Sequence, residues 1–411
     1  MMGRPFHLPR TYRMTNQKRA LFAAMSGYAL DGFDLLMLGF ILTPLATALH
    51  LTTAQSGSLV TWTLIGGALG GSVFGIAGDY LGRARVLSIS ILVFSFFTFL
   101  CAFSVGFKDL FIYRFCAGIG LGCEFGVGMT LATEAYPREK RARIASYVGM
   151  SWQFGVLFAA LLTPFLLPYV GWRGMFIIGG LPAVASFMIR RTVPESQAFA
   201  EVKETGIPHF PLKALFHTVE STKRSLAILI LSTVQNFGYY GIIIWVPSYL
   251  MKVYHFTLNV SGIWTAVSVC GMILGVWAFG EIADRIGRKP TFLIYQVGAI
   301  VTVLLYTMLR TPTELLVGGF VSGIFINGMM GGYGALITDL FPTYARSTAQ
   351  NVIWSVGRAL GGFGPMFFGA LLVYMSFDTA LKVLSGIYII DLITTIFLIP
   401  RNSDARNADP D

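Results

Sequence analysis

Ionisable side chains stand inside several long apolar stretches of the sequence, where little water would reach them. The candidates for chemistry are Asp31, Asp34, Arg114, Glu124, Arg358 and Asp391. In hydrocarbon a charged side chain costs roughly 2.5–3.5 kcal/mol, so it normally persists only when it is paired, lined by water or needed for activity. These stretches therefore predict ion pairs or proton-binding groups, and each residue is weighed below against a purely structural role.

Two of the acids lie together in SGYALDGFDLLMLGF, at residues 26–40. Asp31 and Asp34 are three residues apart, so they share one face of a helix. Two carboxylates so close cannot both stay ionised cheaply unless a cation lies nearby. Either one of them binds a proton, or an arginine sits between them. A purely structural salt bridge is the alternative.

Arg114 opens the stretch RFCAGIGLGCEFG, whose glycines would let a neighbouring helix approach closely. The glycine spacing superficially resembles a dinucleotide-binding loop, but the stretch is apolar and no strand precedes it, which argues against nucleotide binding. Glu124 lies ten residues beyond Arg114, about 15 Å along a helix. It is either a second proton site or a neutral acid bonded to a polar neighbour. Asp391 is more simply an unpaired acid or one at the margin of the lipid.

Arg358, in NVIWSVGRALGGFGP, is a cation that cannot lose its proton. A shift of 205 residues places it opposite Gln153 and places Asp31 opposite Asn236. In two related halves such positions can face one central cavity. A guanidinium there suits a carboxylate gripped by two hydrogen bonds, with Gln153, Asn236 and Tyr240 as polar partners. The alternative is an arginine that only caps the carbonyls of its own Gly-rich, broken helix.

The elements that must position these residues are membrane-spanning helices. The chain is 55% hydrophobic and only 12% charged, and apolar stretches of roughly 20 residues recur, each long enough to cross a hydrocarbon layer of about 30 Å. We predict an all-α polytopic membrane protein with twelve spans, at about 21–45, 56–77, 86–105, 109–132, 142–167, 173–190, 226–250, 260–282, 290–309, 313–338, 347–374 and 377–399.

The basic residues sort by loop. If the N-terminus is cytoplasmic, most of the 30 Lys and Arg fall on the cytoplasmic side, and the loop residues on the other side are Lys108, Arg173, Lys252 and Arg310. Because loops rich in Lys and Arg stay in the cytoplasm, we expect both termini there. The cytoplasmic loops then account for the net charge of +10, and no nucleic acid is expected as a partner.

Nothing in the sequence predicts catalysis. The cysteines lie inside spans without metal-ligand spacing, at Cys101, Cys116, Cys123 and Cys270. No nucleophile and base come together along the chain. We therefore expect neither an enzyme nor a metal or cofactor site.

Two loops of the chain repeat each other. GIAGDYLGRAR at 75–85 and GEIADRIGRKP at 280–290 pair Asp79 with Asp284 and Arg83 with Arg288 at the shift of 205 residues. Such repetition predicts two pseudo-symmetric six-helix bundles, related by an axis along the membrane normal. The expected parts are a cytoplasmic segment 1–20, a first bundle 21–190, a linker 191–225, a second bundle 226–399 and a cytoplasmic tail 400–411.

The Gly-x-x-x-Asp-x-x-Gly-Arg loop after span two, repeated after span eight, resembles the signature loop of the major facilitator superfamily. Tyr80 stands where that pattern usually has Arg, and Ala84 stands where it often has a second basic residue. As a gating latch, the loop would place Asp79 and Asp284 against arginines or helix N-termini, and its last glycine would permit a tight reversal. The alternative is a turn that only orients helices.

The stretches LDGFD, RFCAGIGLG, GWRGMFIIGGLP and VPES together are similar to the metabolite:proton symporters of that superfamily, nearest to its aromatic-acid, nicotinate and sialic-acid carriers. The resemblance implies that Asp34 or Asp31 pairs with Arg114 and couples protons. It also implies a rocker-switch carrier that imports a small organic carboxylate with one or more protons, and no other cofactor. Span five lacks the Gly-Pro pair of the drug/proton antiporters, which favours uptake.

Other functions stay open at this point. One is a carrier of neutral, sugar-like substrates or an efflux carrier of the same superfamily, in which Arg358 only braces its helix. Another is a membrane sensor that does not transport. For each of these functions we expect the protein to be a monomer in a lipid bilayer. The short loops and the resemblance indicate a bacterial inner membrane.

Overall fold

The structure is a computed structural model that describes residues 16–181, 193, 195, 199, 212–253 and 258–400. Helices make up the regular structure, and no strand occurs within these ranges, which confirms the all-α prediction. Most of the predicted segments 1–20, 191–225 and 400–411 lies outside the described residues.

The first half of the chain contributes α1 to α6. The bounds are α1 Asn16–Ala48, α2 Thr53–Leu81, α3 Arg83–Cys101, α4 Phe107–Leu121, α5 Glu124–Glu134 and α6 Arg141–Gly180. The second half contributes α9 Lys213–Phe216, α10 Val219–Val253, α11 Leu258–Ile286, α12 Arg288–Tyr306, α13 Pro312–Gly328, α14 Met330–Leu340, α15 Arg346–Gly361, α16 Gly364–Tyr374 and α17 Phe377–Leu398. Several helices begin 205 residues apart, so the repeat predicted from two loops extends to helix boundaries.

Three predicted spans are each divided into two helices. Span 109–132 consists of α4 and α5, span 313–338 of α13 and α14, and span 347–374 of α15 and α16. Glycine weakens a helix interior and favours a break, and Gly122 and Gly362 stand at two of these joints. The predicted boundary between spans five and six falls at Gly171, whose φ of 63° interrupts α6.

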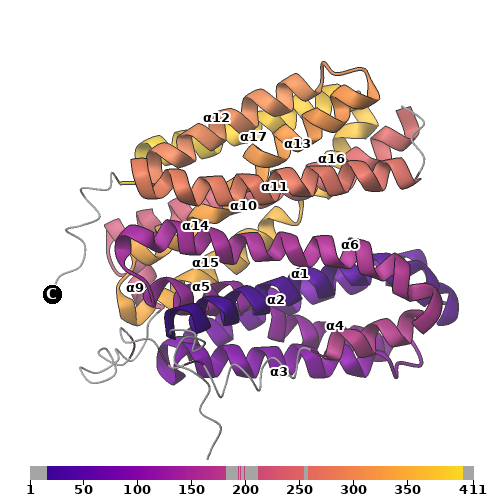
Figure 1. Ribbon diagram of the computed structural model, residues 1–411, viewed down its shortest axis with the longest axis horizontal. Coiled ribbons are helices and arrows are strands. Elements are labelled where there is room, and N and C mark those ends of the chain that lie inside the picture. The colour runs from indigo at the N-terminus through magenta and orange to yellow at the C-terminus, as the bar shows by residue number, and fades with distance from the viewer. Residues whose placement is uncertain are drawn as a thin grey trace, which may run out of the picture.

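The two halves form two bundles that face each other. Figure 1 shows α1 to α4 on one side of the molecule and α12, α13 and α17 on the other, with α5, α14 and α15 between them. Across the interface α6 packs on α11, and α2 packs on α15. The second contact is the first one repeated at the shift of 205 residues, as two pseudo-symmetric bundles require.

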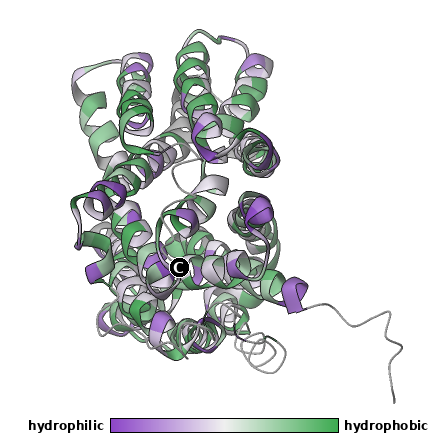
Figure 2. Cartoon of the chain, turned by 90° about the vertical axis from the view of Figure 1, so that its left-hand side faces the viewer, coloured by the Kyte–Doolittle hydropathy of each residue, from purple (hydrophilic) through white to green (hydrophobic). Residues whose placement is uncertain are grey.

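The outer faces of the helices are hydrophobic. Large apolar side chains such as Val73, Phe96, Phe158 and Phe397 are more than half exposed, and in Figure 2 the green of hydrophobic residues recurs along the helices. Among the described residues, nine helices are long and apolar enough to cross a membrane. The sixth, seventh and eleventh predicted spans are not among them, and α15 in the eleventh is short and carries a polar face that packs against the first bundle. An integral membrane protein explains this surface.

Candidate functional site

The first charge pair lies wholly inside the first bundle. Arg114 on α4 donates two hydrogen bonds to Asp34 on α1, from Nη2 to Oδ2 at 2.8 Å and from Nη1 to Oδ1 at 3.2 Å. Arg114 Nε donates to Thr63 on α2 at 3.2 Å, and Thr98 on α3 donates to Asp34 at 3.1 Å. Both charged side chains are buried. The bidentate geometry is the strong form of an ion pair, and it joins four helices.

The second charge pair connects the two bundles. Arg358 on α15 donates from Nη1 to Asp31 Oδ2 at 3.4 Å and from Nε to the Tyr240 hydroxyl on α10 at 3.2 Å. The guanidinium carbon lies 4.5 Å from the ring centroid of Trp152 on α6, in a cation–π contact. The sequence left both acids as candidates for Arg114, and the structure assigns Asp34 to Arg114 and Asp31 to Arg358.

Polar side chains of both halves gather around Arg358. A cavity between the bundles is lined by Gln153, Asn236 and Tyr240 together with Tyr28, Trp152, Tyr239, Asn327, Met330, Trp354 and Arg358. Both amide atoms of Gln153 and the indole nitrogen of Trp354 are buried without a hydrogen bond to a described residue. Such groups normally find partners, so they could bond to a solute. A second cavity reaches Arg358 from the side of Asp31.

Both cavities are narrow in this conformation. Each leaves room for roughly one or two water molecules between its side chains. A bound solute therefore requires the bundles or the lining side chains to move.

Glu124 contacts neither pair. It begins α5, is fully buried, and accepts a hydrogen bond at Oε1 from the Ser90 hydroxyl on α3. Its other oxygen, Oε2, has no hydrogen bond to a described residue and lies against Gly27, one turn before Asp31 on α1. Glu124 therefore remains a candidate proton site. Ser90 is also the polar neighbour to which a neutral acid would bond, so the second alternative remains as well.

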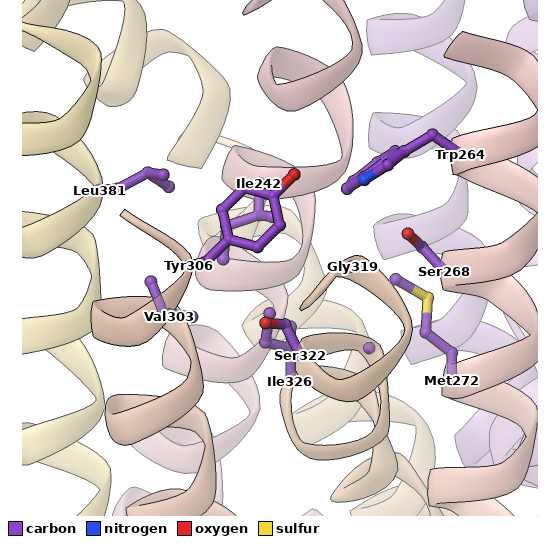
Figure 3. A pocket seen from close by; sticks show the side chains of 11 residues that line it. Ile242, Trp264, Ser268, Met272, Val303, Tyr306, Gly319, Ser322, Ile326 and Leu381 are labelled. Atoms are coloured by element: carbon purple, nitrogen blue, oxygen red, sulfur yellow. The ribbon is translucent and has the colours of Figure 1, made fainter. Parts of the chain in front are cut away.

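The second bundle lacks an equivalent of the Asp34–Arg114 pair. At the corresponding positions it has Gly319 for Arg114, Ser268 for Thr63 and Val303 for Thr98. These three residues line an apolar pocket in the second bundle, in which Trp264 and Tyr306 supply aromatic walls (Figure 3). At the positions equivalent to Arg114, Thr63 and Thr98 the second bundle therefore has only uncharged side chains.

The loop after α2 ties the first bundle to α15. Asp79 accepts hydrogen bonds from the backbone N–H of Ser347 at 3.2 Å and of Thr348 at 2.7 Å, at the N-terminus of α15. It also pairs with Arg83 at 3.1 Å, and Arg83 donates to the Thr343 carbonyl at 2.8 Å. A carboxylate at a helix N-terminus satisfies unpaired N–H groups and the helix dipole.

The loop after α11, in the second bundle, makes the equivalent contacts with α6 of the first bundle. Asp284 accepts from the backbone N–H of Ala142 and Arg143 at the start of α6, both at 3.2 Å. Arg288 donates to the Arg138 carbonyl at 3.1 Å and pairs with Asp339 at 3.2 Å. We call the end of the molecule with Asp79, Arg83, Asp284 and Arg288 the gate face. Both turns use a glycine with positive φ, Gly82 at 102° and Gly287 at 98°.

The halves also meet at their pseudo-symmetry axis on the gate face. The hydroxyls of Thr133 on α5 and Thr338 on α14 lie 3.1 Å apart, and these residues correspond to each other at the shift of 205. Contacts across both loops and at the axis close the gate face in this conformation.

Sequence reasoning missed several residues of these sites. Glu195, in the VPES stretch, accepts from the backbone N–H of Arg83 at 2.7 Å and of Arg85 at 3.0 Å, and the Phe199 ring lies 4.6 Å from the Arg83 guanidinium carbon. The paired acidic and aromatic residues after span six were the available signal. Thr63 gave only a weak signal, because a hydroxyl in an apolar span usually bonds to its own helix.

Comparisons with known proteins agree on one family. A sequence profile described as Major Facilitator Superfamily matches residues 24–279 and 228–411. The “Putative metabolite transport protein” of Haemophilus influenzae is 52% identical over 390 residues, which is 93% of this chain and 96% of that protein. The cis,cis-muconate transport protein of Acinetobacter baylyi is 30% identical over 404 residues, 95% of this chain and 96% of its own. The sialic acid transporter NanX of Escherichia coli is 29% identical over 364 residues, 86% and 88% of the two chains.

A solved structure has the same fold. The proton:xylose symporter XylE, bound to 6-bromo-6-deoxy-D-glucose, superposes with a TM-score of 0.78 over 94% of this chain and 96% of its own, at 17% identity. Similarity at that identity concerns the fold and says nothing of what is carried.

Proposed function

This chain belongs to the major facilitator superfamily, whose members are transporters and not enzymes, and on that premise we propose that it is a proton-coupled symporter importing a small organic carboxylate. The observation that carries the proposal is Arg358, a partly buried guanidinium at the interface of the two bundles that reaches Asp31 with a single long hydrogen bond. The named substrates of two relatives, cis,cis-muconate and sialic acid, are organic acids and support this class.

The substrate carboxylate would bind Arg358 in place of Asp31. Within the described residues Arg358 bonds to Asp31 and Tyr240 only, and a guanidinium has five N–H donors, so donors remain for a carboxylate. Gln153 and Asn236 line the same cavity and would hold the polar groups of the substrate. The aromatic rings of Trp152 and Trp354 give it an apolar wall.

A proton would lower the electrostatic cost of exchanging Asp31 for the substrate carboxylate. Asp31 and Arg358 together are neutral, so an added anion would leave a net negative charge inside the protein, where it is costly. A proton on Asp31 removes that charge and frees Arg358 at the same time. The Asp34–Arg114 pair lies one turn away and is the second place where a proton can replace an ion pair, with Glu124 as a third candidate.

Alternating access would follow from opening the gate face. The basic loops support a cytoplasmic position for that face, and the contacts of Asp79, Arg83, Asp284 and Arg288 would break when it opens. We place the protein, as a monomer with both termini in the cytoplasm, in a bacterial inner membrane.

Uptake into proteoliposomes tests the proposal. Vesicles with an inward proton gradient receive labelled cis,cis-muconate, sialic acid, nicotinate and 4-hydroxybenzoate in turn, with protein-free vesicles as the control. At least one acid should accumulate above its external concentration, and the gradient should be required. Accumulation that ignores the gradient, or no movement of any acid, would count against symport.

Competition separates the alternatives. If Arg358 grips a carboxylate, an acid should inhibit uptake and its amide should not. Equal inhibition by both, or by a neutral sugar, would favour a neutral-substrate carrier. Outward movement against an inward proton gradient would favour efflux. Saturable binding without any movement would favour a sensor.

A further inference from the structure

A carboxyl group that takes no part in the sites above is buried in the second bundle. Asp391 on α17 is fully buried, so of the two alternatives drawn from the sequence, an unpaired acid and an acid at the margin of the lipid, the second is wrong. Neither of its oxygens has a hydrogen bond to a described residue. Asp391 therefore lacks both the cation that Asp31 and Asp34 have and the donor that Glu124 has.

Among the side chains that the structure describes, the helices packed on α17 supply no charge for it. α12 and α10 make the main contacts. Lys289 on α12 instead donates to the carbonyls of Ile396 and Ile399, at 2.8 and 2.7 Å. Arg224 on α10 bonds to Glu220 and to the Leu340 carbonyl. Lys382 lies nine residues before Asp391, about 13 Å along α17.

The nearby polar groups are neutral oxygens. Tyr388, one turn before Asp391, has a buried hydroxyl without a hydrogen bond to a described residue. Tyr333 on α14 lies within electrostatic range and donates to the Leu231 carbonyl at 2.9 Å. On α12, Gln296 donates to Thr395 at 2.8 Å, which leaves its buried Oε1 without a bond.

An ionised carboxylate is not stable in such surroundings. A buried charge without a counter-ion or hydrogen bonds is avoided by taking up a proton. The neutral acid needs no counter-ion, and neither Tyr388 nor Gln296 forms a hydrogen bond with Asp391 that would stabilise the ionised form. We propose that Asp391 is a further proton-binding site of the carrier, loaded in this gate-closed conformation and separate from Glu124 and from the pairs at Arg114 and Arg358.

A physical connection links Asp391 to the substrate site. The Tyr388 hydroxyl lies so close to Gly238 on α10 that a Cβ there would overlap it. Two residues further on, Tyr240 bonds to Arg358. When Arg358 changes its partner, a shift of α10 reaches Tyr388 directly and alters the surroundings of Asp391. The proton on Asp391 then responds to the substrate.

The test, which rests on the proposed function, is the proton-to-substrate ratio in proteoliposomes. Asp391→Asn mimics a permanently neutral acid, so substrate exchange without net proton movement should persist. Steady-state accumulation should fall about tenfold for each pH unit of gradient, since one coupled proton is lost and a pH unit is a factor of ten per proton. Ser385→Ala, a buried change on the same helix, should leave the ratio unchanged. An unchanged ratio in Asp391→Asn, loss of exchange, or a sodium requirement for accumulation that Asp391→Asn abolishes would overturn the proposal.

Infrared difference spectroscopy on purified protein needs no transport. A neutral carboxyl band should be present at neutral pH, shift in Asp391→Glu and change when substrate is added. A band that persists without change at all pH values and with substrate would identify a structural acid and overturn the proposal. If uptake of every acid fails while the band still titrates, the proposed substrate class is wrong and the proton site stands.

Discussion

Asp31 and Asp34 lie one turn apart on α1, yet Asp34 holds an arginine of its own bundle and Asp31 an arginine of the other. The first pair is bidentate at 2.8 Å, and the second is a single contact at 3.4 Å. A pair inside one bundle can persist while the bundles move. A pair between bundles must adjust whenever they rock, so Asp31 is better placed to compete with a substrate.

The Asp34–Arg114 pair yields the first prediction. Asp34→Asn removes the charge and leaves Arg114 buried without a counter-ion, which costs about 3–5 kcal/mol. We expect gradient-driven uptake to be abolished and thermal stability to fall. Uptake by reconstituted protein and its melting temperature check this. Thr98→Val, which removes one hydrogen bond to Asp34, is the control and should retain driven uptake; full accumulation by Asp34→Asn would refute the coupling role.

Substrate charge recognition at Arg358 yields the second prediction. Arg358→Lys keeps the charge but loses the planar fork and the contact with Trp152. Affinity for a carboxylate should fall about 10- to 100-fold, corresponding to roughly 1.4–3 kcal/mol for the lost charge-assisted bond. Isothermal titration calorimetry with an acid and its amide measures it. The ratio of the affinities for the acid and for its amide should be smaller in the variant. An unchanged affinity for the acid would mean that Arg358 has only a structural role.

The sequence could predict which charges matter but not which of them meet. Asp31 and Asp34 share a helix face, and a long arginine side chain can reach either, so residue spacing leaves the pairing open. The bond from Arg358 to Asp31 depends on how two bundles dock. The same holds for Glu195, whose bonds to the start of α3 span 112 residues of sequence.

At the scale of helices, carboxylates at two N-termini hold the gate face together. Asp79 caps α15 and Asp284 caps α6, so each bundle stabilises a helix of the other. The two caps differ in strength. Asp79 is fully buried and has a hydrogen bond of 2.7 Å, whereas both backbone bonds of Asp284 are 3.2 Å long.

This asymmetry gives the third prediction. Asp79→Asn should shift the equilibrium towards the open gate by at least tenfold, about 1.4 kcal/mol, because it weakens a helix cap and leaves Arg83 with less counter-charge. Distances between spin labels across the gate face would report the open population. Asp284→Asn is the matched variant and should have the smaller effect. Equal distance distributions in wild-type protein and Asp79→Asn would contradict it.

The positions of the helices were easier to predict from the sequence than the breaks within them. Long apolar stretches identify the spans, and the signature loop locates the turns between α2 and α3 and between α11 and α12. A glycine alone does not cause the breaks at Gly122 and Gly362, since other glycines, such as Gly70 and Gly118, stay helical. Sequence gives the glycines but not which of them ends a helix.

At the scale of the whole molecule, Thr133 and Thr338 allow the gate to be locked. Their hydroxyls lie 3.1 Å apart, so cysteines at these two positions would have their side chains in contact across the axis, where oxidation can cross-link them. Combining Thr133→Cys with Thr338→Cys, in a background without the native cysteines, should give a carrier that stops transporting under oxidation and recovers under reduction. Uptake assays with each single variant as control check this. A disulfide that forms while uptake continues would show that the gate face does not need to open.

The reciprocity of the gate contacts has a consequence for how such a chain can arise. Asp79 bonds to α15 as Asp284 bonds to α6, and Arg83 reaches the Thr343 carbonyl as Arg288 reaches that of Arg138. Two separate copies of one six-helix chain could satisfy every one of these bonds. These reciprocal bonds do not involve the linker between the halves, so an ancestral dimer of identical subunits could already have formed them.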